Sequence, residues 1–299
     1  MLRHLPTGRL IRLRPRTTIG RGPTNVMRLR NRLASSEHAI LSWSGDTWTI
    51  RDLGSRNGTW HGDRKLLPGE TITLERGQTL AFGDGNDRWQ IIEVAPPQPF
   101  AEAITGDAVV DAIGGILALP SSADPQLTIY ASGDGWFAED DAGLRPVSDQ
   151  EIVLTGDTAW RLAVPEIVPR TITAAPGRFI AGLALRLRVS RDQEYVEVSV
   201  RADTDWITLA PRAYHYMLVV LAEERLADAT ASRADRGWLH MEDLADKLGQ
   251  EPRTLNVHVC RLRQQLGQLG FDEAASIVER RPGTGQIRLG TDAVELGAL

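Results

Sequence analysis

Three short polar segments near the start of the chain contain the side chains best suited to binding a phosphate group. They read "IGRG" at 19–22, "SSEH" at 35–38 and "GSRNGT" at 54–59. An arginine guanidinium presents a planar fork of N–H donors to phosphate oxygens, while serine hydroxyls and asparagine amides add neutral donors. Ser35 and His38 could alternatively be a nucleophile and its base, but the sequence shows no pattern that indicates a third orienting group or an oxyanion hole.

The residues around these segments alternate between apolar and polar side chains, which is the spacing of a half-buried β-strand. Ala39, Leu41 and Trp43 alternate along one strand, "SGD" provides a turn, and Trp48 and Ile50 return along the next strand. The later runs "TITL", "QTLAFG" and "WQIIEV" add strands and show no helical period. This pattern predicts an all-β sandwich in which the three polar segments are loops, the usual location of binding residues.

At these residues the chain resembles the forkhead-associated (FHA) domain family, whose pattern is Gly-Arg, then Ser-x-x-His, then Asn-Gly-Thr. The resemblance implies a β-sandwich that binds phosphothreonine peptides through its loops. It further implies that Arg21 and Ser35 hold the phosphate and that Asn57 bonds the peptide backbone. The family also uses the positions of Ser36 and Arg56 for contacts to the phosphate or to peptide side chains.

Four other residues of the pattern are expected to shape the loops, either by holding them in place or by adopting backbone conformations closed to other residues. These residues are Gly20, His38, Gly58 and Thr59. Two positions depart from the family pattern. Ser36 stands where a basic residue or asparagine is frequent, and Arg56 stands where a small hydroxylated residue is common. Arg56 offsets the missing charge, and the peptide preference stays open.

The net charge of −5 conceals a segregation of charge along the chain. Residues 1–36 carry nine arginines and no acidic residue, whereas residues 100–176 carry three arginines and twelve acidic residues. Residues 252–271 are basic again, with three arginines and no acid. The basic segments are expected to attract anions. The acidic middle segment is expected to be either a solvated spacer or an internal docking face for one of the basic surfaces.

Proline-rich stretches mark the expected boundaries between three domains. "APPQPF" at 95–100 interrupts the first β-rich stretch, and "VPEIVPRTITAAPG" at 164–177 has three prolines and no clear period. The domains are therefore expected at 1–95, 100–165 and 180–290. The middle domain is expected to be β-rich, because its short alternating runs are broken by Gly and Asp turns.

The last segment begins with two alternating runs, "ALRLRVS" and "YVEVSV", and then changes to a helical period. A first helix is predicted from Pro211, and "MEDLADKLG" predicts a second helix that ends at Gly249. A third helix is predicted to begin at Pro252 with one buried stripe of apolar residues. This stripe consists of Leu255, Val259, Leu262 and Leu266.

The opposite face of this third helix carries cations, amides and one small apolar residue, which suits the major groove of DNA. Arginine bonds guanine, amides bond adenine, and Val257 can meet a thymine methyl group. "SIVERRPGTGQIRLG" predicts a hairpin that brings Arg280 and Arg281 to phosphate or to the minor groove. The helix residues expected to point away from the core are Arg253, Val257, Cys260, Arg261 and Gln264, with Thr254, Asn256 and Arg263 at the flanks.

Here the chain resembles the winged-helix DNA-binding domain of the OmpR/PhoB response-regulator family, from about Leu185 to Leu289. The strongest matches are "NVHVCRLRQQL" at 256–266 and "GTGQIRL" at 283–289. The resemblance implies a strand meander, helices and a C-terminal hairpin, in which the third helix reads double-stranded DNA. The residues expected to contact DNA are Arg253, Thr254, Val257, His258, Arg261, Arg263, Arg280 and Arg281.

Several features depart from this second family. Cys260 replaces a frequently basic residue, Gln286 stands where an aromatic is usual, and Pro282 stands where arginine is frequent. Residues 186–290 hold fifteen basic and sixteen acidic residues, so any attraction to DNA must come from the helix face itself. The alternative is a winged helix that serves as a platform for binding protein.

Other function classes are not favoured by the sequence. It contains no phosphate-binding Gly-Lys-Ser/Thr loop, nucleophile elbow or zinc-ligand pattern, and the single Cys260 cannot form an internal disulfide. We expect no enzyme activity, metal, cofactor or small-molecule substrate. No run of about 18 apolar residues and no secretory signal occurs, so we expect a cytoplasmic protein without a membrane partner.

The sequence as a whole predicts a multidomain protein: an N-terminal all-β FHA-like sandwich, a β-rich middle segment and a C-terminal α+β winged helix. The corresponding hypothesis is a bacterial transcription regulator coupled to Ser/Thr kinase signalling, which binds a phosphothreonine-containing protein, either the kinase or its substrate, and double-stranded DNA. The alternative is a phosphopeptide-binding adaptor or scaffold with no role on DNA.

Overall fold

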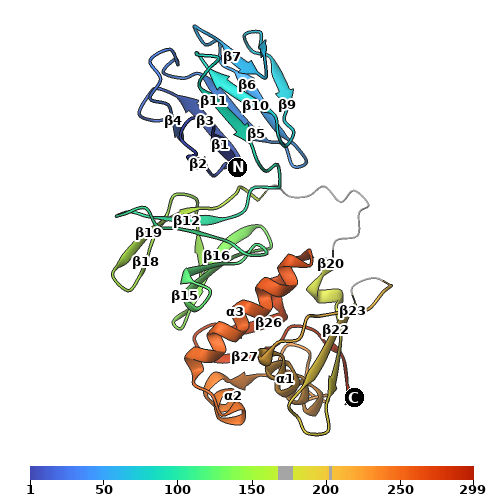
Figure 1. The fold of residues 1–299 in the computed structure, drawn as a ribbon. Coiled ribbons are helices and arrows are strands. Elements are labelled where there is room, and N and C mark those ends of the chain that lie inside the picture. Colours follow the sequence, from blue (N-terminus) through green and yellow to red (C-terminus); the bar gives the residue numbers. More distant parts are fainter. Residues whose placement is uncertain (168–177, 202–203) are drawn as a thin grey trace. The chain divides into compact units, whose positions relative to one another are not determined.

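The computed structural model describes residues 1–167, 178–201 and 204–299. The chain divides into two compact units, Met1–Gln98 and Pro99–Leu299. The protein is rich in β-sheet, and the α-helices of its described residues lie near the C-terminus (Figure 1).

The first unit is a β-sandwich built from a six-stranded and a five-stranded sheet. The strand orders are β2-β1-β11-β10-β7-β8 and β4-β3-β5-β6-β9, and neighbours are antiparallel except for the parallel pair β3–β4. Apolar side chains from both sheets, such as Ile19 and Phe82, form one buried cluster. The strands are β1 (Leu2–His4), β2 (Leu10–Ile11), β3 (Arg16–Gly20), β4 (Met27–Arg28), β5 (Ala39–Trp43), β6 (Trp48–Asp52), β7 (Thr59–His61), β8 (Arg64–Lys65), β9 (Thr71–Thr73), β10 (Thr79–Phe82) and β11 (Arg88–Ile91).

The alternation of side chains along β5 and β6 confirms the strand prediction. The two strands pair with Ala39 opposite Asp52 and Trp43 opposite Trp48. Leu41 and Ile50 are fully buried, since alternate side chains of a strand point to the same face. This pairing carries β6 to Asp52, where the loop that contains the Asn-Gly-Thr segment begins.

The start of the second unit, residues 99–164, contains two four-stranded antiparallel sheets and is called the middle module below. Its strand orders are β13-β12-β19-β18 and β14-β15-β16-β17, and its core includes Leu117, Ile129 and Trp160. Residues 168–177 of the proline-rich boundary lie outside the described residues. The strands are β12 (Phe100–Ala103), β13 (Val109–Asp111), β14 (Leu117–Ser121), β15 (Asp124–Ser132), β16 (Gly135–Asp140), β17 (Gly143–Val147), β18 (Ile152–Thr155) and β19 (Thr158–Ala163).

Residues 178–299, called the C-terminal module below, combine helices with short sheets. One sheet has the order β23-β22-β21-β28; in the chain, β21, β22 and β23 come before the helices and β28 comes after them. A second sheet has the order β24-β27-β26. The elements are β20 (Arg178–Phe179), β21 (Ala184–Val189), β22 (Val196–Arg201), β23 (Ile207–Thr208), α1 (Tyr216–Ala227), β24 (Leu239–His240), α2 (Met241–Leu248), α3 (Pro252–Gln268), β25 (Phe271–Asp272), β26 (Val278–Arg281), β27 (Gln286–Leu289) and β28 (Ala293–Ala298).

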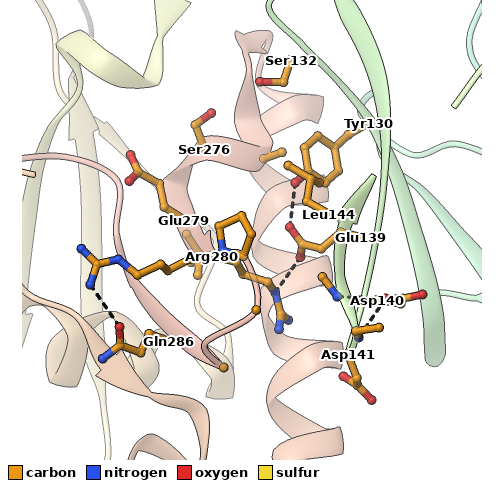
Figure 2. A pocket seen from close by; sticks show the side chains of 18 of the residues that line it. Tyr130, Ser132, Glu139, Asp140, Asp141, Leu144, Ser276, Glu279, Arg280 and Gln286 are labelled. Carbon is orange, nitrogen blue, oxygen red and sulfur yellow. Dashed lines mark hydrogen bonds and ion pairs between the residues drawn. The ribbon is translucent and has the colours of Figure 1, made fainter. Parts of the chain in front are cut away.

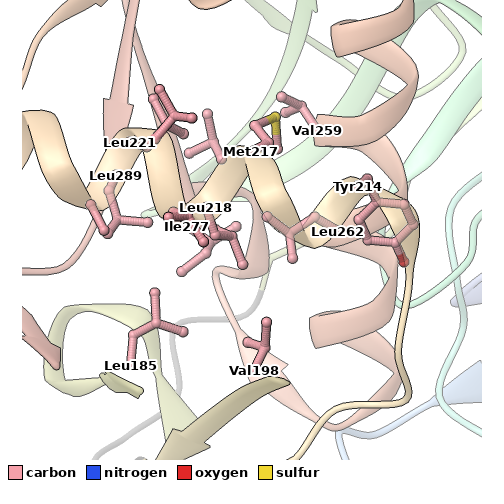
Figure 3. Close-up of a cluster of buried hydrophobic side chains, with 14 of the residues drawn as sticks. Leu185, Val198, Tyr214, Met217, Leu218, Leu221, Val259, Leu262, Ile277 and Leu289 are labelled. Carbon is pink, nitrogen blue, oxygen red and sulfur yellow. The ribbon is translucent and has the colours of Figure 1, made fainter. Parts of the chain in front are cut away.

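One hydrophobic core joins these elements (Figure 3). Leu218 of α1 and Leu262 of α3 lie in the same cluster as Leu185 and Val198 of the first sheet. The stripe predicted for α3 is confirmed, because each of its members is at most 1% exposed: Leu255, Val259, Leu262 and Leu266.

The end of α2 and the start of α3 were predicted correctly, but the start of α1 was not. Gly249 ends α2 in the left-handed conformation with φ 60°, and Pro252 occupies the first turn of α3. The first helix begins at Tyr216 rather than at Pro211, after a 3-10 turn. The side chains of Tyr214 and His215 in that turn bond to one Gln265 oxygen at 3.1 and 3.0 Å, so a tertiary contact fixes the non-α-helical turn.

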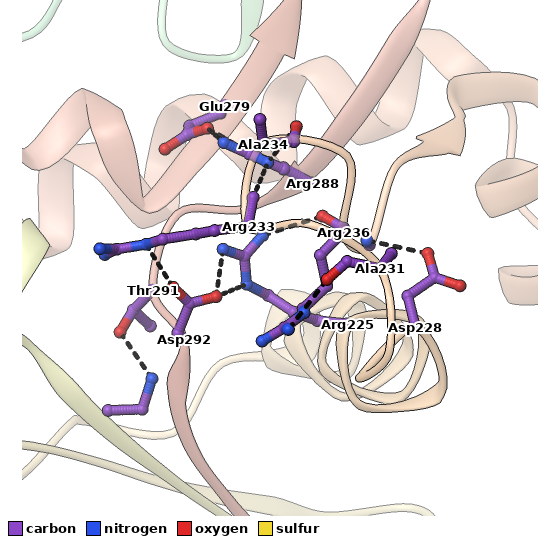
Figure 4. Close-up of polar contacts among 12 residues, drawn as sticks. Arg225, Asp228, Ala231, Arg233, Ala234, Arg236, Glu279, Arg288, Thr291 and Asp292 are labelled. Carbon is purple, nitrogen blue, oxygen red and sulfur yellow. Dashed lines mark hydrogen bonds and ion pairs between the residues drawn. The ribbon is translucent and has the colours of Figure 1, made fainter.

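A polar cluster attaches the last strand to the helices (Figure 4). Asp292, just before β28, accepts a 2.9 Å hydrogen bond from the almost fully buried Arg225 of α1 and forms a 2.6 Å ion pair with Arg233. Burial alone would raise the pKa of Asp292, but the hydrogen bond and the charge of Arg225 lower it below its usual value. Thr291 adds a hydrogen bond to the Leu183 carbonyl.

Candidate functional site

Three loops of the β-sandwich contain the residues that the sequence singles out. The first loop follows β3, the second connects β4 to β5, and the third connects β6 to β7. The antiparallel pairing of β3 with β5 and of β5 with β6 brings these loops together, because Ile19 lies opposite Ala39, which in turn lies opposite Asp52. Residues far apart in the chain thereby share one end of the sandwich.

Ser35 is the hub that connects the three loops. Its carbonyl accepts a 2.8 Å hydrogen bond from the backbone N–H of Arg21, and its hydroxyl oxygen accepts one of 3.0 Å from the backbone N–H of Arg56. Its own N–H donates to His38 Nδ1 at 3.0 Å, so the opposite ring nitrogen donates to the Gly58 carbonyl at 3.1 Å. The hydroxyl hydrogen of Ser35 is left to donate to a ligand.

Two asparagines fix the loop backbone around this hub. Asn57 Nδ2 donates to the Leu33 carbonyl at 2.8 Å, which leaves its carbonyl oxygen and second amide hydrogen for a ligand. Asn25, which the sequence analysis did not single out, donates to the Ser36 carbonyl at 2.6 Å and to the Gly22 carbonyl at 3.1 Å. The loops are thus held by hydrogen bonds to backbone groups, which still leave part of the bonding capacity of Ser35 and Asn57 for a ligand.

Asp52 holds the third loop in place and, like Asn25, was not singled out in the sequence analysis. Its buried carboxylate accepts hydrogen bonds from the N–H groups of Gly54 and Ser55 at 2.8 and 2.9 Å. It accepts two more, each of 2.7 Å, from the hydroxyls of Ser55 and Thr59. Burial alone would raise the pKa of Asp52, but these hydrogen bonds lower it. The sequence pattern that could have revealed this role is an Asp two residues before a Gly at the end of a strand, which is typical of an Asx turn.

Both glycines of the pattern lie where another residue would be disfavoured, Gly20 by a clash with backbone and Gly58 by its positive φ. A Cβ atom on Gly20 would be 2.3 Å from the Ser36 carbonyl oxygen. Gly58 adopts φ +90°, and a Cβ atom there would be 1.9 Å from the Cε atom of Lys65. Lys65 therefore lies over the Asn-Gly-Thr segment and adds a cation to the site.

The side chains expected to contact a ligand are accessible. Arg21, Ser36 and Arg56 are exposed, and Ser35 and Asn57 are half-buried. The guanidinium groups of Arg21 and Arg56 form no hydrogen bond or ion pair with any residue that the structure describes. The loop cluster thus offers unpaired cations, a serine hydroxyl and an amide, which together match a dianion on an extended segment.

The residues expected to contact DNA fall into an accessible group and a covered group. Thr254 and Arg261 are exposed, and Val257 and His258 are half-buried. Burial, assisted by the charge of Arg261, lowers the pKa of His258 below its usual value, so His258 is neutral near pH 7. On the hairpin, Arg281 contacts Asp235 at 3.2 Å within the same module.

The other basic residues of this set contact the middle module. Arg253 bonds to Asp124 at 2.6 Å, and Arg280 forms a 2.7 Å ion pair with Glu139. Arg263 is only 2% exposed and pairs with the same carboxylate at 2.8 Å. The expectation that Arg263 contacts DNA is therefore corrected, because its guanidinium is buried against an acid of the middle module.

Cys260 and Gln264 were expected to point away from the core into solvent. Both are buried, at 1% and 6% exposure, because the middle module covers this face of α3. Burial raises the pKa of the Cys260 thiol to about 11.

No helix among the described residues is both long and apolar enough to span a membrane. Within the same residues, no group of three or more His, Cys, Asp or Glu side chains is placed to hold a metal ion.

Comparison with known proteins identifies the first unit. The FHA domain family matches residues 17–83, so the N-terminal sandwich contains an FHA domain. This match includes all three polar loops and ends before the middle module. No curated protein matches the chain.

Solved structures with similarity to the chain include several FHA domains. An FHA domain studied for phosphothreonine-dependent interactions is 27% identical, with 32% of this chain and 95% of that chain covered and a TM-score of 0.28. The FhaA FHA domain, solved in complex with the intracellular domain of Rv3910, is 26% identical, with 30% and 94% covered and a TM-score of 0.27. Mycobacterium tuberculosis EmbR, in complex with a low-affinity phosphopeptide, is 24% identical, with 32% and 24% covered and a TM-score of 0.28.

Proposed function

We propose that this protein is a phosphothreonine-dependent transcription regulator, which binds a phosphorylated protein through its FHA domain and double-stranded DNA through its C-terminal module. The observation that carries the first part is the exposed guanidinium of Arg21, which pairs with no residue that the structure describes and lies in a loop that bonds to Ser35. A guanidinium without a carboxylate partner is available to a phosphate dianion. The bound protein would be a Ser/Thr kinase or one of its substrates.

The roles within the site follow from the hydrogen bonds that are already used. Arg21 supplies charge, and the Ser35 hydroxyl donates to a phosphate oxygen while its own oxygen accepts from Arg56 N–H. Asn57 is anchored through one amide hydrogen to Leu33, so its carbonyl oxygen can accept from the peptide backbone. Arg56 and Lys65 add positive charge at the rim of the site.

Binding of a phosphothreonine peptide library, measured by fluorescence anisotropy against the same library without phosphate, tests this part. We expect Arg21→Ala to weaken binding by about 10- to 100-fold, the usual worth of a charge-assisted hydrogen bond. Arg76→Ala is the matched control. Arg76 is exposed and comes two residues after Leu74. The N–H of Leu74 bonds to the Trp48 carbonyl, at the end of β6 that is opposite to the third loop. Equal binding by wild type and Arg21→Ala would refute the site.

The DNA-binding part is supported by the order of elements in the C-terminal module. A strand meander precedes α1, α2 and α3, a hairpin of β26 and β27 follows, and Arg261 remains exposed on α3. Gel shifts with promoter fragments at low salt test this part. We expect Arg261→Ala to weaken the shift and to leave phosphopeptide binding unchanged.

A phosphopeptide-binding adaptor is the second candidate function. It is favoured by one observation, namely that Arg253, Arg263 and Arg280 are already engaged by acids of the middle module. If neither the wild-type protein nor variants in which α3 is freed from the middle module give a gel shift at low salt, the adaptor is the better description.

A further inference from the structure

One face of helix α3 lies against the middle module along the length of the helix. The residues that make this contact recur at steps of three or four, with one adjacent pair, so they form a single stripe beside the apolar stripe of the core. They are Arg253, Asn256, Cys260, Arg263, Gln264 and Gly267.

A buried ion cluster lies at the centre of this contact (Figure 2). Glu139 of β16 is 5% exposed and pairs with Arg263 of α3 at 2.8 Å and with Arg280 of the hairpin at 2.7 Å. The hydroxyl of Tyr130 donates a 2.6 Å hydrogen bond to the same carboxylate. Burial alone would raise the pKa of Glu139, but the two arginines lower it to about 2, so the carboxylate is charged at neutral pH.

Apolar packing and a close backbone approach surround this cluster. Cys260 of α3 is buried with Ile116 and Tyr130 of the middle module. Near the end of α3, a Cβ atom on Gly267 would lie 1.9 Å from the Gly114 carbonyl oxygen. The two backbones therefore touch, which only glycine at position 267 permits.

Acidic and amide contacts complete the interface at its exposed end. Asp124 accepts hydrogen bonds from Arg253 at 2.6 and 3.0 Å, and Asp141 accepts one from Asn256 at 2.9 Å. Carboxylates thus occupy positions at α3 where DNA would present phosphate oxygens and base acceptors. A cavity of about 360 Å³ next to the ion cluster is lined by both modules.

We propose that the middle module is a resident partner of helix α3, and that its acidic face competes with DNA for the outward face of that helix. The inference rests on the DNA-binding function proposed above. The same arginines cannot pair with Asp124 and Glu139 and also contact DNA. DNA binding by the full chain therefore requires the interface to open.

Two variants open the interface without touching the exposed residues left to read DNA. Gly267→Ala places a methyl group against the Gly114 carbonyl, while alanine favours the helix itself by about 1 kcal/mol over glycine. Its control is Gly297→Ala, where a Cβ atom meets nothing within 4 Å. Asp124→Asn with Asp141→Asn removes two interface charges. Its control is Asp107→Asn with Asp157→Asn, which changes the net charge equally at exposed positions without a contact to α3 among the described residues.

The single cysteine reports opening in the absence of DNA. Cys260 is 1% exposed at this interface, so a maleimide should label the full-length wild type slowly. We expect Gly267→Ala and the Asp124/Asp141 variant to be labelled at least several-fold faster and to bind a short mixed-sequence duplex at low salt several-fold more tightly. Both controls should behave as wild type.

A second readout does not depend on any variant. Hydrogen exchange of residues 112–118, on the middle-module side, should accelerate when wild type is saturated with the duplex, because DNA would displace this segment from α3. Unchanged exchange at saturation, or wild type binding the duplex as tightly as an opened variant, would overturn the competition. If the opened variants expose Cys260 and none binds the duplex, the DNA-binding function itself fails.

Discussion

Glu139 and Arg263 form a buried ion pair between positions 124 residues apart in the chain, with oxygen and nitrogen separated by 2.8 Å. Neither side chain is more than 5% exposed. Each desolvated charge depends on its partner, because an isolated buried charge is strongly unfavourable. The pair therefore ties the middle module to α3 at one definite position.

Removal of the carboxylate should destabilise the second unit. We expect Glu139→Ala to lower its free energy of unfolding by about 3–5 kcal/mol, because the buried Arg263 and the half-buried Arg280 both lose their carboxylate partner. Glu151→Ala removes the exposed pair with Arg145, at 32% and 48% side-chain exposure, and should cost at most about 1 kcal/mol. Urea denaturation followed by hydrogen exchange of residues 99–299 measures both. Equal costs for the two variants would contradict the importance of the buried pair.

Gly20→Ala should disrupt the phosphopeptide site without altering any polar group. Its Cβ atom would collide with the Ser36 carbonyl at 2.3 Å, so the second loop must move. We expect at least a roughly 10-fold loss of phosphopeptide affinity, the equivalent of one misplaced charge-assisted hydrogen bond. Gly85→Ala is the control, because its Cβ atom would make only ordinary contact with Trp60 at 3.9 Å. Anisotropy titrations that show the same affinity for both variants would argue against loop placement by Gly20.

Asp52→Asn should loosen the third loop. The carboxylate accepts four hydrogen bonds, from Gly54, from Ser55 twice and from Thr59, and an amide can accept through only one oxygen. We expect a loss of about 1–3 kcal/mol in stability of the first unit and weaker phosphopeptide binding. Asp46→Asn in the exposed β5–β6 turn serves as the control. Thermal unfolding is the measurement, and an unchanged midpoint for Asp52→Asn would count against this role.

The stability of the first unit should fall as the pH decreases below the usual pKa of histidine. Burial lowers the pKa of His38 below 6.5, and the Gly58 carbonyl and Asp52 oppose this only partly. The unfolded chain therefore binds a proton at His38 more readily than the folded domain does. The neutral His38 ring makes its full contribution to stability above about pH 6.5. This contribution is lost as the pH falls through the pKa of His38 in the folded domain.

An NMR titration of the His38 ring measures this directly, and denaturation at several pH values measures its effect on stability. We expect the His38→Asn variant to be less stable overall but to lack this part of the pH dependence, since asparagine does not titrate. A ring that titrates at 6.5 or above in the folded protein would contradict the prediction.

Local patterns in the sequence were sufficient for the elements whose residues follow a simple period. Alternation along 39–50 predicted β5 and β6, and the apolar spacing after Pro252 predicted α3 and its buried stripe. The loop residues of the FHA domain were also recognisable, because Gly-Arg, Ser-x-x-His and Asn-Gly-Thr are local segments. Asn25 was not, because it bonds to the Ser36 carbonyl, which only folding brings near. Asp52 was overlooked although its bonds to Gly54 and Ser55 are local and follow the spacing of an Asx turn.

The tertiary structure decided which face of α3 is free. Helical periodicity separates a core face from an outward face, and by that rule Cys260 and Gln264 belonged to the outward face and Arg263 to its flank. Periodicity carries no information about what a second module does to the outward face. The sequence by itself determined the strands β5 and β6, the helix α3 with its buried stripe, and the three loop segments typical of an FHA domain. The burial of Arg263 against Glu139 was fixed only by the packing of two modules, because the desolvation and pairing of charges depend on three-dimensional proximity.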